Sequence, residues 1–324
     1  MNLSLQDLQR EVAATGFPGE TLEKSIRLVS LLNALRSHPF LKTRIALKGG
    51  TALNLFIFDV PRLSGDIDLN YIGAPDRDVM LAERPKLEQA LQAVCGREGL
   101  TVRSLPSDHA GGKWRLTYAA ASGRSGNLEL DVNYLLRTPL WPAELADSHP
   151  VGSFQATQVR VLDLHELAAG KLAALLSRNA SRDVFDAVEL LRREDLDRAK
   201  LRLGFVVYGG ANRKDWRAVS AKDVKLDAAE LKSQLLPTVR PGALPKAKAK
   251  TLVSDCRDLL SAVLPLTREE REFIERLNER GEIAPNLLTD DAAMGRAIHQ
   301  HPALRWKAIN VRKHRGLPTA EQAE

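Results

Sequence analysis

The spacing of apolar residues divides the chain into three stretches. The first is helical, because its apolar residues recur at helical intervals between Ile26 and Leu35. The second, from Arg44 to Leu162, mixes strand-like runs with two helix-like runs. From Leu164 onward the pattern is helical again. This order predicts an α+β protein whose sheet lies in the first half of the chain.

The strand-like runs can be placed more closely. The run IALK ends in a pair of glycines, TALNLFIF has the length of a short helix, and DIDLNYIG alternates carboxylates with apolar residues. A helix is expected at 81–95, and further strands are expected at 100–105, 113–120, 128–134 and 158–162. We therefore predict a sheet domain over residues 1–163 and a mainly helical domain over residues 164–324.

Composition limits the compartment and the class of protein. With 324 residues, of which 44% are hydrophobic, the chain is long enough for two cores. No apolar run approaches the roughly 18 residues that span a bilayer, and the first residues lack the pattern of a secretory signal. Cys95 and Cys256 stand alone, without the spacing of a zinc site. We expect a cytoplasmic protein without a membrane segment.

The net charge of +6 lies in the second half of the chain. Residues 1–165 hold 18 basic and 18 acidic residues, whereas residues 166–324 hold 29 and 23. Such an excess suits a polyanionic partner, although a mildly basic solvated surface has the same composition. Charge alone therefore leaves both interpretations open.

Asp66 and Asp68 are the first candidates for chemistry. They flank Ile67 in a predicted strand, so both carboxylates point to one face while Ile67 points to the other. Two oxygen ligands on a rigid strand suit Mg²⁺, which also takes water and phosphate oxygens. A DxD pair on a solvated strand face is nevertheless common, so the pair alone does not decide the function.

The turn that precedes this strand favours a metal site over a solvated strand face. Lys48, Gly49, Gly50 and Thr51 lie between an apolar strand and a helix start. The glycines let the backbone approach a triphosphate, and the N–H groups and the Thr51 hydroxyl can bind its oxygens. The alternative is a plain strand-to-helix turn capped by Thr51. Such a turn followed by a carboxylate pair indicates a nucleotide site with Mg²⁺.

A third carboxylate is expected on a neighbouring strand. The segment LELDVNY offers Glu129 and Asp131 on one face, and we favour Asp131 because apolar residues flank it. Two further residues lie close to the pair in sequence. Ser64 is within reach of a bound phosphate, and Arg62 is either a phosphate contact or an exposed loop arginine.

These motifs together resemble the AbiEii family of nucleotidyltransferases, which are toxins of type IV toxin–antitoxin systems. The resemblance rests on KGGTALNL, RLSGDIDLN, LDVNY and HELAAGKLAALLSRNASRDVFDAVELL, with HPALRWKAIN near the C-terminus also similar. It implies a nucleotidyltransferase fold with a mixed β-sheet, an NTP substrate, and a helical domain that completes the active site and an acceptor groove. The 15 residues between Gly50 and Asp66 exceed the spacing usual in the wider polymerase-beta-like superfamily.

The resemblance also gives roles to residues after the sheet. Lys171 lies on an apolar helical stripe, where a lysine either snorkels to solvent or meets an anion, and the family lysine at this position is proposed to hold nucleotide phosphates. Asp183 and Asp186 match an active-site RDxxD pair, although Asp183 is equally suited to the first turn of a helix. Arg178 and Arg182 can add positive charge at the same site.

The C-terminal segment HPALRWKAINVRKHR mixes basic residues with Trp306. Such a segment can neutralise phosphates while the ring stacks on a base. We favour the alternative in which Trp306 belongs to the core and the charges form a solvated helix face.

Three functions follow as hypotheses. The leading one, implied by the resemblance, is transfer of a nucleoside monophosphate from NTP to the 3′ end of tRNA, which would block translation, with an AbiEi-type antitoxin as a further partner. The second keeps the enzyme but changes the acceptor to a protein hydroxyl or a small molecule. The third is a catalytically silent module that binds nucleic acid or an antitoxin.

Overall fold

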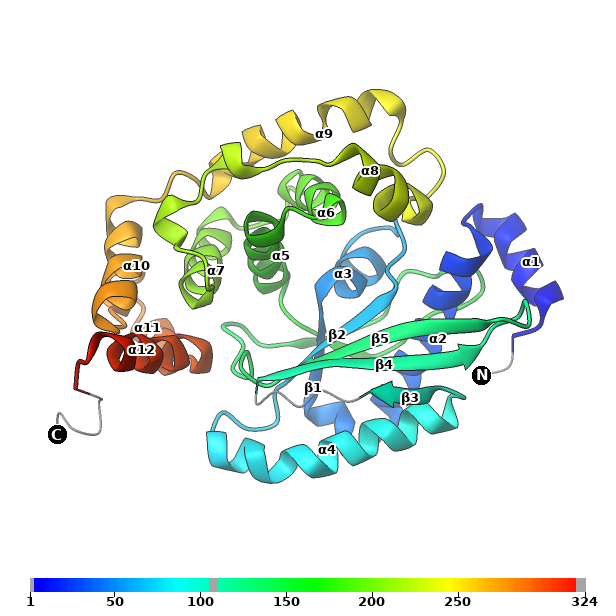
Figure 1. The fold of residues 1–324 in the computed structure, drawn as a ribbon, viewed down its shortest axis with the longest axis horizontal. Coiled ribbons are helices and arrows are strands. Elements are labelled where there is room, and N and C mark those ends of the chain that lie inside the picture. The colour runs from blue at the N-terminus through cyan, green and yellow to red at the C-terminus, as the bar shows by residue number, and fades with distance from the viewer. Residues whose placement is uncertain (1–2, 105–109, 319–324) are drawn as a thin grey trace. The chain divides into compact units, whose positions relative to one another are not determined.

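The computed structural model describes residues 3–104 and 110–318, and it divides the chain into two compact units (Figure 1). The first unit contains residues 1–163 and 228–250, and the second contains residues 164–227 and 251–324. Within the described ranges, no helix combines the length and the apolar character needed to cross a membrane.

The first unit is built on a seven-stranded sheet in the order β3-β4-β5-β2-β1-β7-β6. Most neighbours are antiparallel, whereas β2 runs parallel to β5 and β1 parallel to β7. The strands are β1 (Ile45–Lys48), β2 (Asp66–Tyr71), β3 (Thr101–Ser104), β4 (Gly111–Ala119), β5 (Ser125–Asn133), β6 (Glu144–Ala146) and β7 (Val159–Val161). The sheet is therefore mixed, as predicted.

The helices of the first unit include α1 (Leu5–Thr15), α2 (Gly19–Ser37), α3 (Gly49–Ala52), which continues as a π-helical turn (Leu53–Ile57), and α4 (Arg77–Arg97). Helix α2 packs against β5 and β7, and α4 packs against β3. Leu32 and Leu35 of α2 line a small cavity together with Leu47 and Leu69 of the sheet. Alternate residues of β2 face opposite sides of the sheet. Because Leu69 faces α2, Asp66 and Asp68 face the opposite, polar side.

Residues 228–250 return to the first unit after the chain has built part of the second. They contain α8 (Ala228–Glu230) and a π-helical turn (Leu231–Leu235). The Leu63 N–H donates to the Thr238 carbonyl at 2.8 Å, and the Arg240 N–H donates to the Pro61 carbonyl at 2.9 Å. These bonds pair the returning segment with the loop that leads into β2.

The second unit is helical. Its helices are α5 (Leu164–Arg178), α6 (Ser181–Leu191), α7 (Arg198–Ala211), α9 (Lys246–Leu259), whose first residues belong to the first unit, α10 (Arg268–Arg280), α11 (Ala292–Gln300) and α12 (Pro302–Arg315). Helix α5 packs against α6 and α7, and α12 packs against α7, α10 and α11. The predicted α+β class is confirmed.

The predicted elements of the sheet are found with shifted ends. Helix α4 begins earlier than residue 81 because the Asp76 carboxylate accepts from the N–H groups of Asp78 and Val79 and so caps it. The strand expected at 100–105 is observed as β3, and its last residue lies outside the described residues. Strand β5 starts at Ser125, where its antiparallel hairpin with β4 begins. The short strand β6 was not predicted.

Candidate active site

Acidic side chains share one face of β2 and β5. Asp66 and Asp68 are two residues apart on β2 and point to the same side. The parallel register sets Asp131 of β5 opposite Asp68, and it sets Glu129 opposite Asp66. Since neighbouring strands lie about 4.8 Å apart, four carboxylates gather on a small part of the sheet.

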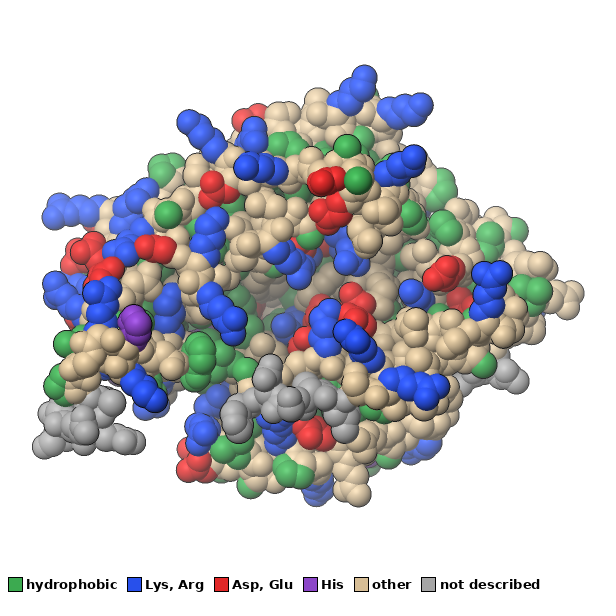
Figure 2. Space-filling view, in the orientation of Figure 1, with side chains coloured by type: hydrophobic (Ala, Val, Ile, Leu, Met, Phe, Trp, Pro, Cys, Tyr) green, Lys and Arg blue, Asp and Glu red, His purple; other side chains and the backbone are tan. Residues whose placement is uncertain are grey.

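Basic residues flank this acidic group on both sides. A single row crosses four strands in the order Lys48, Asp68, Asp131 and Lys113. Lys113 donates to Glu129 at 2.5 Å, and this bond raises the pKa of the Lys113 ammonium group. Over the β4–β5 part of the sheet, Figure 2 shows acidic side chains beside basic ones. The lysines offset part of the repulsion among the carboxylates.

Asp131 and Glu129 differ in their surroundings. Burial raises the pKa of Asp131, and the nearby Asp68 carboxylate raises it further, whereas Lys48 and Lys113 act in the opposite direction. Glu129 is instead held by its ion pair with Lys113. This difference favours Asp131 as the third member of the acidic group.

The acidic group is partly accessible to solvent. Asp66, Asp68 and Asp131 are each partly exposed. Among residues 3–104 and 110–318, no three Asp, Glu, His or Cys side chains are arranged so that they could hold a metal ion by themselves.

The glycine turn lies directly against Asp68. Gly49 has φ +73°, and a Cβ atom added to it would lie 2.0 Å from the Asp68 Oδ2 atom. An L-residue is strained at this φ, and the space is already filled by the carboxylate. Gly49 is therefore required both by the backbone conformation and by the close approach of the turn to the carboxylate.

We expect Gly49→Ala to lower the free energy of unfolding by roughly 1–2 kcal/mol from the left-handed backbone alone, with a further cost from the displaced Asp68 carboxylate. Gly65→Ala is the matched control, because the nearest atom to a Cβ at Gly65 is the flexible Lys24 Cδ at 4.0 Å. Urea unfolding of the two variants measures the difference. Equal stabilities would contradict the packing described for Gly49.

The second glycine lies beside Arg62 and Ser64. A Cβ atom at Gly50 would be 3.2 Å from Arg62 Nη2 and 3.3 Å from Ser64 Oγ. Arg62 is only 2% exposed, which excludes the alternative of an exposed loop arginine, and its expected contact with phosphate stays a prediction. The cause of this burial is the returning segment 228–250, since Arg62 forms a β-bridge with Val239.

Thr51 is fully buried in this turn. Its hydroxyl donates to the Asp66 carbonyl, which ties the start of the helix to β2. In this conformation its hydroxyl positions Asp66, and its expected contact with phosphate stays a prediction.

The remaining predicted residues belong to the second unit, where they form a cluster of their own. The Lys171 ammonium group lies 2.8 Å from Asp183 Oδ1 and 2.8 Å from Asp186 Oδ2. Arg178 reaches Asp183 at 2.7 Å from a largely exposed position. Lys171 therefore meets anions and does not snorkel to solvent. Arg182 follows at the start of α6 and is half-buried.

Asp183 is stabilised in its charged form although it is buried. Burial by itself would raise the pKa of Asp183, but Lys171 and Arg178 outweigh it and the pKa is lowered. The three buried members, Lys171, Asp183 and Asp186, are each less than one tenth exposed. Two carboxylates on one lysine leave a net negative charge that Arg178 balances.

Lys113 and Arg115 are residues of this site that were not predicted. Both lie on the polar face of β4, and the register sets Arg115 opposite Glu129. The alternation in KWRLTY was a usable signal, because it places both basic residues on one face. What the sequence did not reveal was the pairing of β4 with β5.

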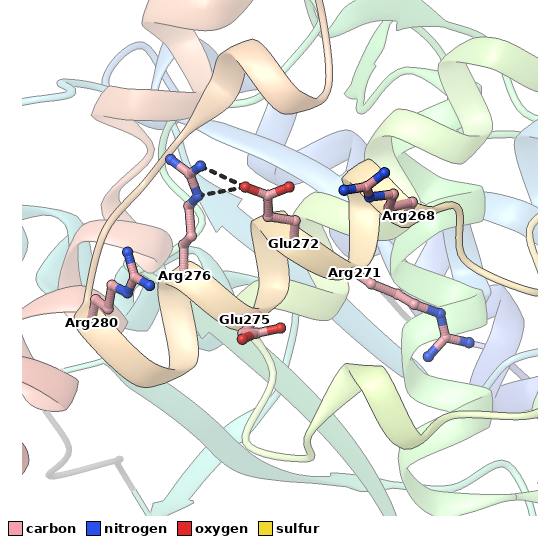
Figure 3. A pocket seen from close by; sticks show the side chains of 6 residues that line it. All are labelled: Arg268, Arg271, Glu272, Glu275, Arg276 and Arg280. Carbon is pink, nitrogen blue, oxygen red and sulfur yellow. Dashed lines mark hydrogen bonds and ion pairs between the residues drawn. The ribbon is translucent and has the colours of Figure 1, made fainter.

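A separate hollow of about 630 Å³ lies on α10 (Figure 3). It is lined by Arg268, Arg271, Glu272, Glu275, Arg276 and Arg280. Arg276 pairs with Glu272 at 2.5 Å and with Glu282 at 3.0 Å. Because one helix supplies the whole lining and the charges are of both signs, we interpret this hollow as a solvated helix face.

Comparisons with known proteins agree with the geometry of the first unit. The family model described as nucleotidyl transferase AbiEii toxin, type IV TA system, matches residues 30–318. Among solved structures, the nucleotidyltransferase toxin MenT4 from Mycobacterium tuberculosis is similar with a TM-score of 0.62 and 18% sequence identity, over 94% of this chain and 99% of that one. A search of curated proteins finds no match. At this identity the solved structure supports the fold alone.

Proposed function

Because the chain belongs to the AbiEii family of nucleotidyltransferase toxins of type IV toxin–antitoxin systems, we propose that it transfers a nucleoside monophosphate from an NTP to the 3′ end of tRNA. In this reaction the acceptor hydroxyl attacks the α-phosphorus, the bond to the β-phosphate oxygen breaks, and pyrophosphate leaves. A tRNA with an altered 3′ end is not aminoacylated, so translation stops.

The observation that supports this proposal most strongly is the row that joins Asp68 to Asp131, with Asp66 on the same face. Mg²⁺ is usually bound through one or two carboxylates together with water and substrate phosphates. The open arrangement of these aspartates fits that chemistry. When bound, Mg²⁺ lowers the pKa of an attacking hydroxyl and stabilises charge on the leaving group.

The glycine turn is proposed to hold the triphosphate. Gly49 and Gly50 are partly exposed, so their backbone can approach phosphate oxygens. Arg62 and Ser64 lie beside Gly50 and can add a charge and a hydroxyl, while Lys48 precedes the turn. Thr51 is proposed to act chiefly by positioning Asp66.

The second unit is proposed to supply further phosphate contacts. Lys171 is held by two carboxylates, which fix its position. Asp183 and Asp186 are thus proposed as positioning residues for Lys171. Arg178, which is exposed, and Arg182 are proposed to add positive charge for the nucleotide.

RNA is preferred as the acceptor because the positive charge of the chain lies in its second half. A partner antitoxin follows from the family, and we propose one of the AbiEi type.

The test is incubation of the protein with each labelled NTP in turn, together with total cell RNA and cell protein, in the presence of Mg²⁺ or of EDTA. Label is expected on the 3′ end of tRNA, only with Mg²⁺. Label on protein or on a small molecule would overturn the choice of acceptor. Binding of RNA with no transfer under any condition would favour the catalytically silent module.

A further inference from the structure

Trp306 is an exposed aromatic residue in a basic setting. Trp306 is 50% exposed. Among the large hydrophobic residues that are exposed in the described part of the chain, it is the single aromatic one. The expectation that it belongs to the core was wrong. Leu304 and Ala308 occupy the buried side of α12, and a step of two residues turns Trp306 by about 200° away from them.

A pocket of about 300 Å³ lies beside this ring. Its lining includes Trp306, Lys307, His314 and Arg315 from α12 together with Asn212 and Arg213 from the end of α7. We call it the Trp306 pocket. Ala211 and Val311 also line it, and the side chains of Asn278 and Asn310 complete its walls.

Basic side chains outnumber acidic ones around the Trp306 pocket. Helix α12 carries five Lys and Arg residues and no Asp or Glu. Two acidic side chains lie nearby: Glu279 is engaged by both Arg217 and Arg315, and Asp215 is engaged by Arg217. On the face shown in Figure 2, basic side chains lie over α10 to α12, with some acidic side chains among them. This setting is complementary to phosphate groups.

The Trp306 pocket is joined by hydrogen bonds to the end of the helix that carries Lys171. The Lys307 ammonium group donates to the Asn212 carbonyl at 2.7 Å, and the Asn212 amide donates to Ser177 Oγ of α5 at 2.8 Å. Ser177 precedes Arg178, which pairs with Asp183. The pocket and the Lys171 cluster are therefore parts of one framework within the second unit.

We propose that the Trp306 pocket binds an unpaired nucleotide of RNA, with its base stacked on Trp306 and its phosphate near Arg213 and Lys307. Base stacking requires a free base face, which a single strand offers and a duplex interior does not. The inference rests on the proposed function only in that RNA is the acceptor, and it assigns this acceptor a contact within the second unit.

The experiment measures binding of a short, fluorescein-labelled single-stranded RNA by fluorescence anisotropy, without NTP. Trp306→Ala is expected to weaken binding about 5- to 100-fold, the size of one base–aromatic contact, whereas Trp306→Phe retains most of the affinity. Ile309→Ala is the matched control, because Ile309 is equally exposed on α12 but does not line the pocket. A blunt duplex of the same sequence should bind equally to all variants.

Equal affinity of the wild type and Trp306→Ala for the single strand would overturn the proposal, and so would an equal loss in Ile309→Ala. If Trp306→Ala does not fold, cross-linking of wild-type protein to RNA containing 4-thiouridine decides instead, because the proposal requires cross-links to α12 or the end of α7. Transfer is measured separately. If the wild type transfers nucleotide and Trp306→Ala binds RNA as well as the wild type does, only the proposal for the pocket is refuted. If Trp306→Ala loses RNA binding and the wild type transfers no nucleotide, only the proposed function is refuted.

Discussion

Asp68→Asn is expected to reduce nucleotide transfer by more than about 100-fold while the protein stays folded. Loss of a group that merely orients a metal ligand already costs about 10–100-fold, and Asp68 is proposed as a ligand itself. Asparagine keeps the shape of the side chain that fills the space beside Gly49. It removes one negative charge next to Asp131, so it also relieves repulsion in the row.

The measurement is the initial rate of incorporation of labelled nucleotide into tRNA at several Mg²⁺ concentrations. Circular dichroism and urea unfolding establish that the variant is folded. Glu129→Gln is the matched control, since Glu129 lies on the same face but is held by Lys113. We expect less than about a tenfold change for it, in keeping with an exposed ion pair that contributes little. Full activity of Asp68→Asn, or equal losses in both variants, would refute the assignment of the metal ligands.

Local pattern was sufficient to predict the arrangement of the acidic group. The alternation in DIDLNY placed Asp66 and Asp68 on one face, and the similar alternation in LELDVNY offered Asp131 and Glu129. The register between β2 and β5 confirms that the two segments are neighbours. Period-two patterns are informative here because one face of the sheet is apolar and buried.

Features that depend on distant segments could not be predicted. Arg62 is buried because Val239 pairs with it, and nothing in the local pattern near residue 62 indicates that partner. Trp306 was expected in the core from its type alone, but the buried side of α12 is already filled by Leu304 and Ala308. The facing of Lys113 toward the carboxylates likewise depends on strand pairing.

Lys171→Met is expected to lower the free energy of unfolding by about 3–5 kcal/mol, the usual cost of removing one partner from a buried ion pair. Methionine fills a similar volume, so the loss comes from charge. Asp183 and Asp186 would remain buried without this cation, while the exposed Arg178 still pairs with Asp183. Urea unfolding at neutral pH measures the effect.

Arg178→Gln is the control, because its side chain is 65% exposed and its ion pair is partly screened by solvent. Its expected cost is below about 1 kcal/mol. A triple variant that adds Asp183→Asn and Asp186→Asn to Lys171→Met should recover part of the lost stability, because replacing all members of a buried ionic group is often neutral. A triple variant less stable than Lys171→Met would show that the two carboxylates are not the source of the loss.

The dependence on pH separates this account from a simple packing defect. In the wild type the pKa of Asp183 is lowered, so its contribution to stability is full above its unfolded pKa of about 3.9 and is lost as the pH falls further. In Lys171→Met the carboxylates lack their main cation, so protonation relieves the strain and the variant gains relative stability as the pH falls. Both trends narrow the difference in unfolding free energy between the wild type and Lys171→Met at low pH. Unfolding free energies measured from pH 7 down to the lowest pH at which both proteins still fold test this, and a difference that stays constant would indicate lost packing instead of unpaired charge.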